Sequence, residues 1–155
     1  MKPPAGVVER PPERGPQQEQ LDAFEGQWRM EGENLAAASD GAGETVSGDQ
    51  SFHWMSGSFF MVHLWSHRFH SGHHEGIACL GYDGRRGEYE WQAFDSLGYA
   101  RRYDVAIGVN AMLLSGPHER AEIILDGDRM TTTWERSTDG RHWEPLCRLR
   151  GTRIA

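Results

Sequence analysis

The sequence predicts an all-β protein, a single antiparallel up-and-down β-barrel of about ten strands with a short N-terminal helix. Three observations support this prediction. Apolar and polar residues alternate along most of the chain, and side chains two apart in a strand point to the same face of a sheet. Short turns rich in Gly, Asp and Ser separate the alternating segments, and no long segment has a helical pattern. A sandwich has the same spacing, but closing the sheet into a barrel removes the exposed strand edges.

The size and charge of the chain limit its partners. With 155 residues, the chain is most simply one domain that is large enough to bury a sizeable core. Its 25% charged and 37% hydrophobic residues are ordinary for a soluble protein. The net charge of −7 argues against nucleic acid or an anionic membrane as a partner, because phosphate groups bind clustered Lys and Arg.

The N-terminal region divides into a tail and a short helix. Residues 1–18 contain five prolines and few apolar side chains, which predicts a disordered tail. Residues 18–25 predict a helix with Leu21 and Phe24 on one side, ended by a glycine. We expect this helix to cover one end of the barrel, and residues 19–155 to form the barrel domain.

The first half of the barrel is predicted from four alternating segments. Trp28 and Met30 alternate with polar residues in the first segment, the second ends in an aromatic patch, and the third is the most apolar. Loop composition over residues 36–43 and turn sequences at residues 57–58 and 71–72 separate these segments. The four strands are expected at residues 28–35, 44–55, 59–70 and 75–82.

The second half of the chain repeats the pattern with shorter connections. The first of its strands places Tyr89, Trp91 and Ala93 on one face, with polar side chains on the other. Turns are expected wherever Asp, Asn or Ser meets Gly, as at residues 83–84 and 126–128. The six strands are expected at residues 88–95, 99–107, 112–115, 120–125, 129–136 and 142–150.

The location of the protein is inferred from the N-terminal region and the cysteines. No apolar signal segment is present, and no apolar run approaches the length that crosses a membrane. We therefore expect a cytoplasmic protein in which Cys79 and Cys147 are reduced. Both cysteines fall in expected strands without a CxxC neighbour, so we expect them to be buried as small hydrophobic side chains.

Five histidines between residues 63 and 74 are the most conspicuous candidate site. On a strand, His63 and His67 lie ~13 Å apart, too far to bind the same metal ion. A zinc or haem site would therefore have to use His70, His73 and His74 around the turn. The alternative is a solvated turn with one or two histidines inside the barrel, and we favour this alternative, with no bound metal or cofactor.

The third strand has two apolar faces, so its orientation stays open. If the odd-numbered face points inward, His63, Trp65 and His67 line a cavity; if the even-numbered face does, Val62 and Leu64 fill a conventional core. An imidazole of near-neutral pKa in such a cavity can bind a ligand oxygen or transfer a proton.

Two later strands carry a second candidate site. We expect Gln92, Arg101 and Tyr103 to share one face and to form a site for an anion or a carbonyl oxygen, with the guanidinium and the hydroxyl as donors. The alternative is that Asp95 or Asp104 binds Arg101 at the sheet surface.

Trp134 is a further candidate lining residue, and its neighbour Glu135 faces the opposite way in a strand. We expect Glu135 to pair at the surface with Arg129 or Arg148. The sequence has no GxSxG nucleophile motif and no nucleotide-binding glycine loop.

Several motifs resemble a known family. Gly26-Gln27-Trp28 is the GxW sequence that begins many lipocalin-like (calycin) barrels. FDSLG at residues 94–98, followed by Arg101-Arg102-Tyr103, and WERSTDGRHWE at residues 134–144 resemble a bacterial family of uncharacterised calycin-like proteins, similar to lipocalins and fatty-acid-binding proteins, of about this length. The resemblance spans residues 21–153, and Leu97 stands where the family pattern has arginine.

This resemblance implies a barrel with a pocket, and it supplies no catalytic set. It also implies that an arginine of the final strand covers Trp28, with Arg148 and Arg150 as candidates.

We therefore expect the protein to bind a small, largely hydrophobic molecule in the barrel cavity. The ligand-binding candidates are His63, Trp65, His67, Gln92, Arg101, Tyr103 and Trp134. One alternative is a cofactor-free isomerase or cyclase, in which His63 or His67 transfers a proton and Arg101 and Tyr103 stabilise an oxyanion. A second alternative is haem or metal binding through the histidines of residues 63–74. The sequence does not determine the oligomeric state, and a homodimer is one possible assembly.

Overall fold

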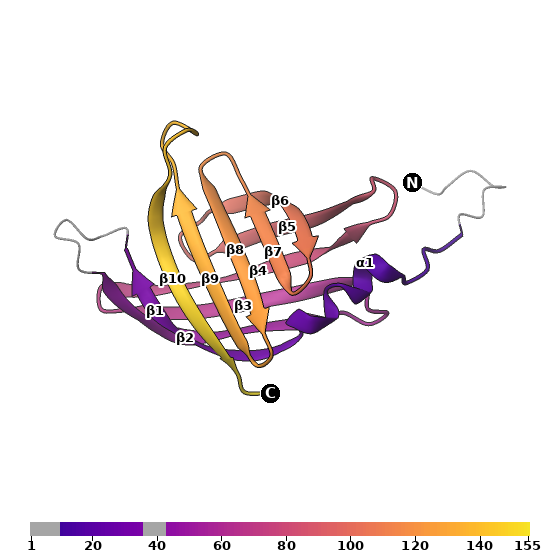
Figure 1. Ribbon diagram of the computed structural model, residues 1–155, viewed down its shortest axis with the longest axis horizontal. Coiled ribbons are helices and arrows are strands. Elements are labelled where there is room, and N and C mark those ends of the chain that lie inside the picture. The colour runs from indigo at the N-terminus through magenta and orange to yellow at the C-terminus, as the bar shows by residue number, and fades with distance from the viewer. Residues whose placement is uncertain (1–9, 36–42) are drawn as a thin grey trace.

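The computed structural model describes residues 10–35 and 43–155, which form a closed barrel of ten antiparallel strands (Figure 1). Each strand pairs with its neighbours in sequence, and β1 pairs with β10 to close the sheet. The strands are β1 Gly26–Asn34, β2 Glu44–Trp54, β3 Phe60–Phe69, β4 Gly72–Asp83, β5 Glu88–Asp95, β6 Ala100–Gly108, β7 Ala111–Ser115, β8 Glu119–Asp126, β9 Arg129–Arg136 and β10 Glu144–Arg153. The predicted fold class is confirmed, and every predicted strand bound lies within three residues of the observed one.

Two predictions concern segments outside the described residues. The loop expected at residues 36–43 falls almost entirely on 36–42, and the first half of the expected tail falls on 1–9. Among residues 10–35 and 43–155, no helix is long and apolar enough to cross a membrane.

The N-terminal helix is shorter than predicted and begins earlier. It comprises α1 (Pro16–Glu19) and a 3-10 turn (Asp22–Phe24). Proline is favoured in the first turn of a helix, where its missing N–H needs no partner, and this places the start of α1 inside the expected tail. Leu21 and Phe24 are fully buried, and Phe24 packs against Phe52 of β2 with ring centroids 6.2 Å apart. The segment therefore covers one end of the barrel, as expected.

An arginine completes this covered end. The guanidinium of Arg153 lies 4.2 Å from the ring centre of Trp28, and Arg153 also donates to the backbone carbonyls of Ala23 and Glu25. The arginine implied by the family resemblance is thus Arg153, and the expectation of Arg148 or Arg150 is wrong. Those two side chains are exposed on the outer face of β10, because they have the opposite parity to Arg153.

The barrel interior takes one face of each strand. On β3, Met61, His63 and His67 are buried, whereas Leu64 is 46% exposed. The odd-numbered face therefore points inward. Cys79 lies on the outer face of β4 and is exposed, so the expectation that it is buried is wrong.

Two glycines allow neighbouring strands to approach each other closely. A Cβ atom on Gly32 of β1 would lie 2.0 Å from the carbonyl oxygen of Arg148, and one on Gly48 of β2 would lie 2.0 Å from that of Ser66. Glycine inside a strand commonly marks such a close approach of two backbones.

Candidate functional site

The interior cavity opens at the barrel end opposite the N-terminal helix. It has a volume of about 350 Å³ and is lined mainly by aromatic and aliphatic side chains. Its rim is formed by residues near Phe69 at the end of β3 and by the turn between β5 and β6. The polar and ionisable residues that line it, apart from the tyrosines and tryptophans, are Asn34, Gln50, His63, His67, His74, Asp95, Arg101, Glu119, Thr132 and Cys147.

Stacked rings form the floor of the cavity. The ring of His63 stacks on Phe52 with centroids 4.1 Å apart, and it lies 5.3 Å from both Trp65 and Trp91. Nδ1 of His63 is 3.1 Å from the carbonyl oxygen of Ser51, so in the neutral ring Nδ1 carries the proton. Burial lowers the pKa of His63 to about 3, which leaves the ring uncharged at neutral pH.

Three buried polar atoms of the cavity lining lack a hydrogen bond among the described residues, and one of them, Nε2 of His74, has Asp95 as an ion-pair partner. Nε2 of His67 and Oγ1 of Thr132 lack hydrogen bonds within the described part of the chain, and the two residues are 9% and 5% exposed. Both residues line the cavity. Burial, followed by the nearby His74 and His73, lowers the pKa of His67 to about 4. The cavity thus offers uncharged hydrogen-bonding groups to a molecule inside it.

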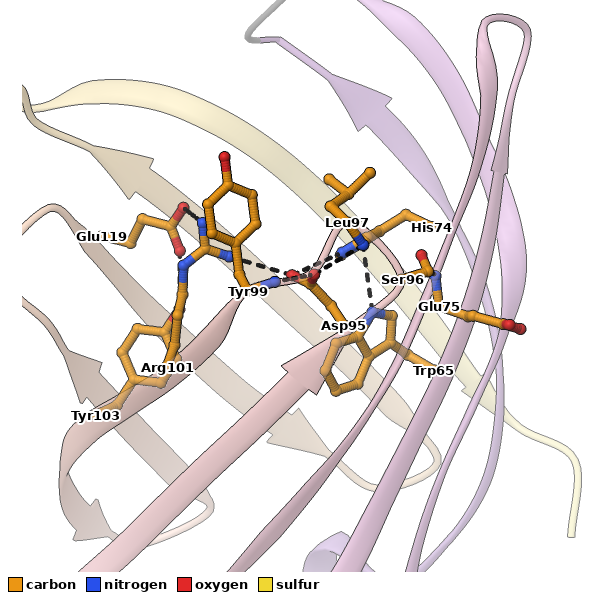
Figure 2. Close-up of polar contacts among 10 residues, drawn as sticks. All are labelled: Trp65, His74, Glu75, Asp95, Ser96, Leu97, Tyr99, Arg101, Tyr103 and Glu119. Atoms are coloured by element: carbon orange, nitrogen blue, oxygen red, sulfur yellow. Dashed lines mark hydrogen bonds and ion pairs between the residues drawn. The ribbon is translucent and has the colours of Figure 1, made fainter.

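A chain of polar contacts crosses the cavity mouth (Figure 2). The indole nitrogen of Trp65 donates to Nδ1 of His74 at 3.4 Å. Nε2 of His74 lies 3.3 Å from Oδ2 of Asp95, within the distance of an ion pair. Arg101 then contacts both Asp95 and Glu119, at 3.3 Å and 3.5 Å. The chain joins residues of β3, β4, β5, β6 and β8.

Asp95 is the centre of this chain. Its side chain is 6% exposed, and Oδ1 accepts hydrogen bonds from the amides of Leu97 and Tyr99 at 2.9 Å and 3.1 Å. Burial alone would raise the pKa of the Asp95 carboxyl, but the hydrogen bonds from Tyr99 and Leu97 and the nearby His74 outweigh burial and lower it. Asp95 therefore remains ionised and holds both the turn and Arg101.

Arg101 and Tyr103 are both bound to Glu119. The Tyr103 hydroxyl donates to Oε2 of Glu119 at 2.8 Å, and the Arg101 guanidinium lies 4.2 Å from the ring centre of Tyr99. Burial, followed by Glu119, raises the pKa of Tyr103. The expected pairing of Arg101 with Asp95 is present. Because Arg101 also binds Glu119, the pair Arg101–Tyr103 is not the free anion site that the sequence suggested.

Of the two other expected site residues, one lines the cavity and one does not. Trp134 lines the cavity and packs edge-on against Tyr103, with ring centroids 5.5 Å apart. Gln92 is exposed on the outer face of β5, opposite Arg102, so the expectation that it shares a face with Arg101 is wrong. Glu135 pairs with Arg120 at 2.9 Å instead of Arg129 or Arg148.

The histidine cluster is divided between the two faces of the sheet. His74 points inward, whereas His73 is exposed and contacts Ser66 at 2.8 Å, and His70 is exposed in the turn. Across residues 10–35 and 43–155, no three His, Cys, Asp or Glu side chains converge on a position that could hold a metal ion. The proposed grouping of His70, His73 and His74 around one ion is therefore wrong.

Four polar residues of the lining were not expected from the sequence, namely Asn34, Gln50, Glu119 and Thr132. Glu119 and Thr132 lie on β8 and β9, and no local pattern distinguishes them from surface residues. The second family motif, in contrast, is a structural loop. Asp139 accepts hydrogen bonds from the amides of Arg141 and His142, both at 2.8 Å, and Gly140 has a positive φ of 75°.

A larger hollow lies on the outer surface of the barrel. It has a volume of about 840 Å³ and is bordered by exposed apolar side chains, including Leu64, Ile77 and Phe94. This hollow is more open to solvent than the interior cavity. We therefore take the interior cavity as the candidate site.

The fold and cavity together define a small closed β-barrel protein with an interior pocket. Residues 13–101, more than half of the chain, match the family described as Protein of unknown function (DUF1579), and the chain belongs to that family. No curated protein matches the chain.

Two solved structures are similar in fold. The crystal structure of Rv2717c from M. tuberculosis has a TM-score of 0.67 and 11% sequence identity, covering 92% of this chain and 100% of that chain. At this identity the likeness shows the fold alone. A fluorescence-activating β-barrel of de novo design has a TM-score of 0.48 and 13% identity, covering 87% of this chain and 97% of that chain.

Proposed function

We propose that the protein binds a small, largely hydrophobic molecule in the barrel cavity. The observation that supports this proposal is an interior, aromatic-lined cavity that contains two buried polar atoms without protein partners, on His67 and Thr132. Buried polar groups in folded proteins are nearly always hydrogen-bonded, and small-molecule sites typically combine apolar walls with a few polar anchors.

The test is native mass spectrometry of the purified protein, before and after denaturation. We expect a molecule of a few hundred daltons to be released. Ala93→Phe should abolish its retention, because Ala93 points into the cavity beside Trp91 and a phenyl ring would occupy that space. Ala106→Phe is the matched control, since Ala106 lies on the outer face of the neighbouring strand. Equal retention by both variants would contradict the proposal, and a released haem would favour the haem alternative.

A second candidate function is a cofactor-free isomerisation or cyclisation in the same cavity. The unpartnered Nε2 of His67 favours it, because this ring nitrogen belongs to the cavity lining and is available to exchange a proton with a bound substrate. Once the ligand is identified, His67→Gln should abolish its conversion while leaving it bound. If the wild-type protein returns the ligand chemically unchanged, the enzyme hypothesis is wrong.

A further inference from the structure

The charged groups at the cavity mouth influence whether a charged ligand can enter the cavity. The cavity lining holds two carboxylates, Asp95 and Glu119, and a single basic side chain, Arg101. The carboxylates of the lining thus outnumber its guanidinium groups by one. A low-dielectric cavity with a negative mouth disfavours the entry of an anion.

Arg101 is not free to offset this charge. Its two terminal nitrogens face different carboxylates, Oδ2 of Asp95 at 3.3 Å and Oε1 of Glu119 at 3.5 Å, and Tyr99 stacks on its planar face. Glu119 also accepts the hydroxyl proton of Tyr103 in a hydrogen bond. A ligand carboxylate could reach the guanidinium only by displacing one of these carboxylates, or by lying close to both.

The deeper polar groups suit an uncharged ligand. Nε2 of His67 and Oγ1 of Thr132 offer hydrogen bonds to a hydroxyl, carbonyl or amide group. Burial holds the pKa of His67 well below neutrality, so this imidazole supplies no positive charge. The lining also includes the indole rings of Trp65, Trp91 and Trp134, and aromatic rings of this kind suit a flat molecule.

We propose that the cavity selects an uncharged, aromatic molecule with a hydrogen-bonding group, and that the Asp95–Arg101–Glu119 arrangement excludes organic acids such as fatty acids. This inference rests on the proposed function, since it names the ligand class of the same cavity.

Two fluorescent probes of the same ring system test the inference. N-phenyl-1-naphthylamine is uncharged, and 1-anilinonaphthalene-8-sulfonate is the same molecule with a sulfonate added. We expect the wild-type protein to bind the uncharged probe at least about tenfold more tightly, because like charges brought together at a binding site are strongly unfavourable. Probe binding is assigned to the cavity if Ala93→Phe abolishes it and Ala106→Phe does not. This criterion distinguishes binding in the cavity from binding at the outer hollow.

Two charge variants on β8 provide the second measurement. Glu119→Gln removes one of the two carboxylates that contact Arg101. It should decrease the ratio of the affinities for the uncharged and the anionic probe about tenfold. Glu122→Gln removes the same charge from the outer face of the same strand, and should keep the wild-type preference. This comparison uses variants without added bulk, so it stands even if Ala93→Phe fails to fold.

The outcomes separate the inference from the function on which it rests. Equal affinity for the two probes, or a preference that Glu119→Gln does not change, would overturn the inference and leave small-molecule binding intact. Failure of both probes to bind the cavity would count against the proposed function itself and would overturn the inference with it.

Discussion

The role of Arg153 gives the sharpest stability prediction. We expect Arg153→Met to lower the free energy of unfolding by about 2–3 kcal/mol. The substitution removes hydrogen bonds to the carbonyls of Ala23 and Glu25 and the contact with the face of Trp28. Each of these three interactions contributes roughly 1 kcal/mol at a partly exposed site. The ion pair with Asp128 adds little, because that carboxylate is 81% exposed.

The assay is urea denaturation followed by tryptophan fluorescence, with thermal melting as a second measurement. A loss of about 2–3 kcal/mol corresponds to a fall in Tm of about 5–10 °C for a protein of this size. Arg150→Met is the matched control, since Arg150 lies on the outer face of the same strand, and it should change stability by less than about 0.5 kcal/mol. If both variants were as stable as the wild type, Arg153 would not fasten the N-terminal segment to the barrel.

Two further predictions concern the backbone and the buried histidines. Gly48→Ala should destabilise the barrel by about 1–3 kcal/mol in denaturant titrations, because its Cβ would meet the carbonyl oxygen of Ser66. Ser47→Ala on the outer face of the same strand should have almost no effect, and equal effects of the two variants would show that position 48 tolerates a side chain. The pKa of His63 is lowered to about 3 and that of His67 to about 4, from an ordinary value of 6.5. Below about pH 6.5 the unfolded chain therefore binds protons that the folded protein does not bind. The free energy of unfolding should be highest above this pH and should decrease toward about pH 4. At pH 5 the loss should be about 2 kcal/mol for each histidine. Denaturant titrations at about pH 7.5 and pH 5 measure this loss of stability. The loss should be smaller in the double variant H63Q/H67Q. A wild-type stability that is the same at both pH values would rule out neutral buried imidazoles.

The network at the cavity mouth explains a family motif that the sequence alone presented only as a pattern. In FDSLG, Asp95 accepts the amide hydrogens of the turn and Gly98 adopts a φ of 89°, a conformation that glycine adopts without strain. Arg101 and Tyr103 then meet Glu119 from a strand that is not adjacent in the sheet. The motif therefore builds one side of the cavity mouth.

The sequence by itself determined the strands and the fold class. Alternation within a strand is a local property, because successive side chains point to opposite faces and side chains two residues apart share a face. For that reason β5 and β9 were predicted at their observed bounds, and the short turns between strands indicated an up-and-down order. The helix was less well predicted, because four residues of α1 carry almost no periodicity of their own.

Only the tertiary structure decided which faces meet and which charges pair. Both faces of β3 are apolar, so its inward face depends on pairing with β2 and β4. Gln92 was misplaced for the same reason, because a shift of one residue between strands moves a side chain to the opposite face. Glu119 and Thr132 reach the cavity through closure of the whole sheet, and no local pattern in the chain records which side chains closure brings together.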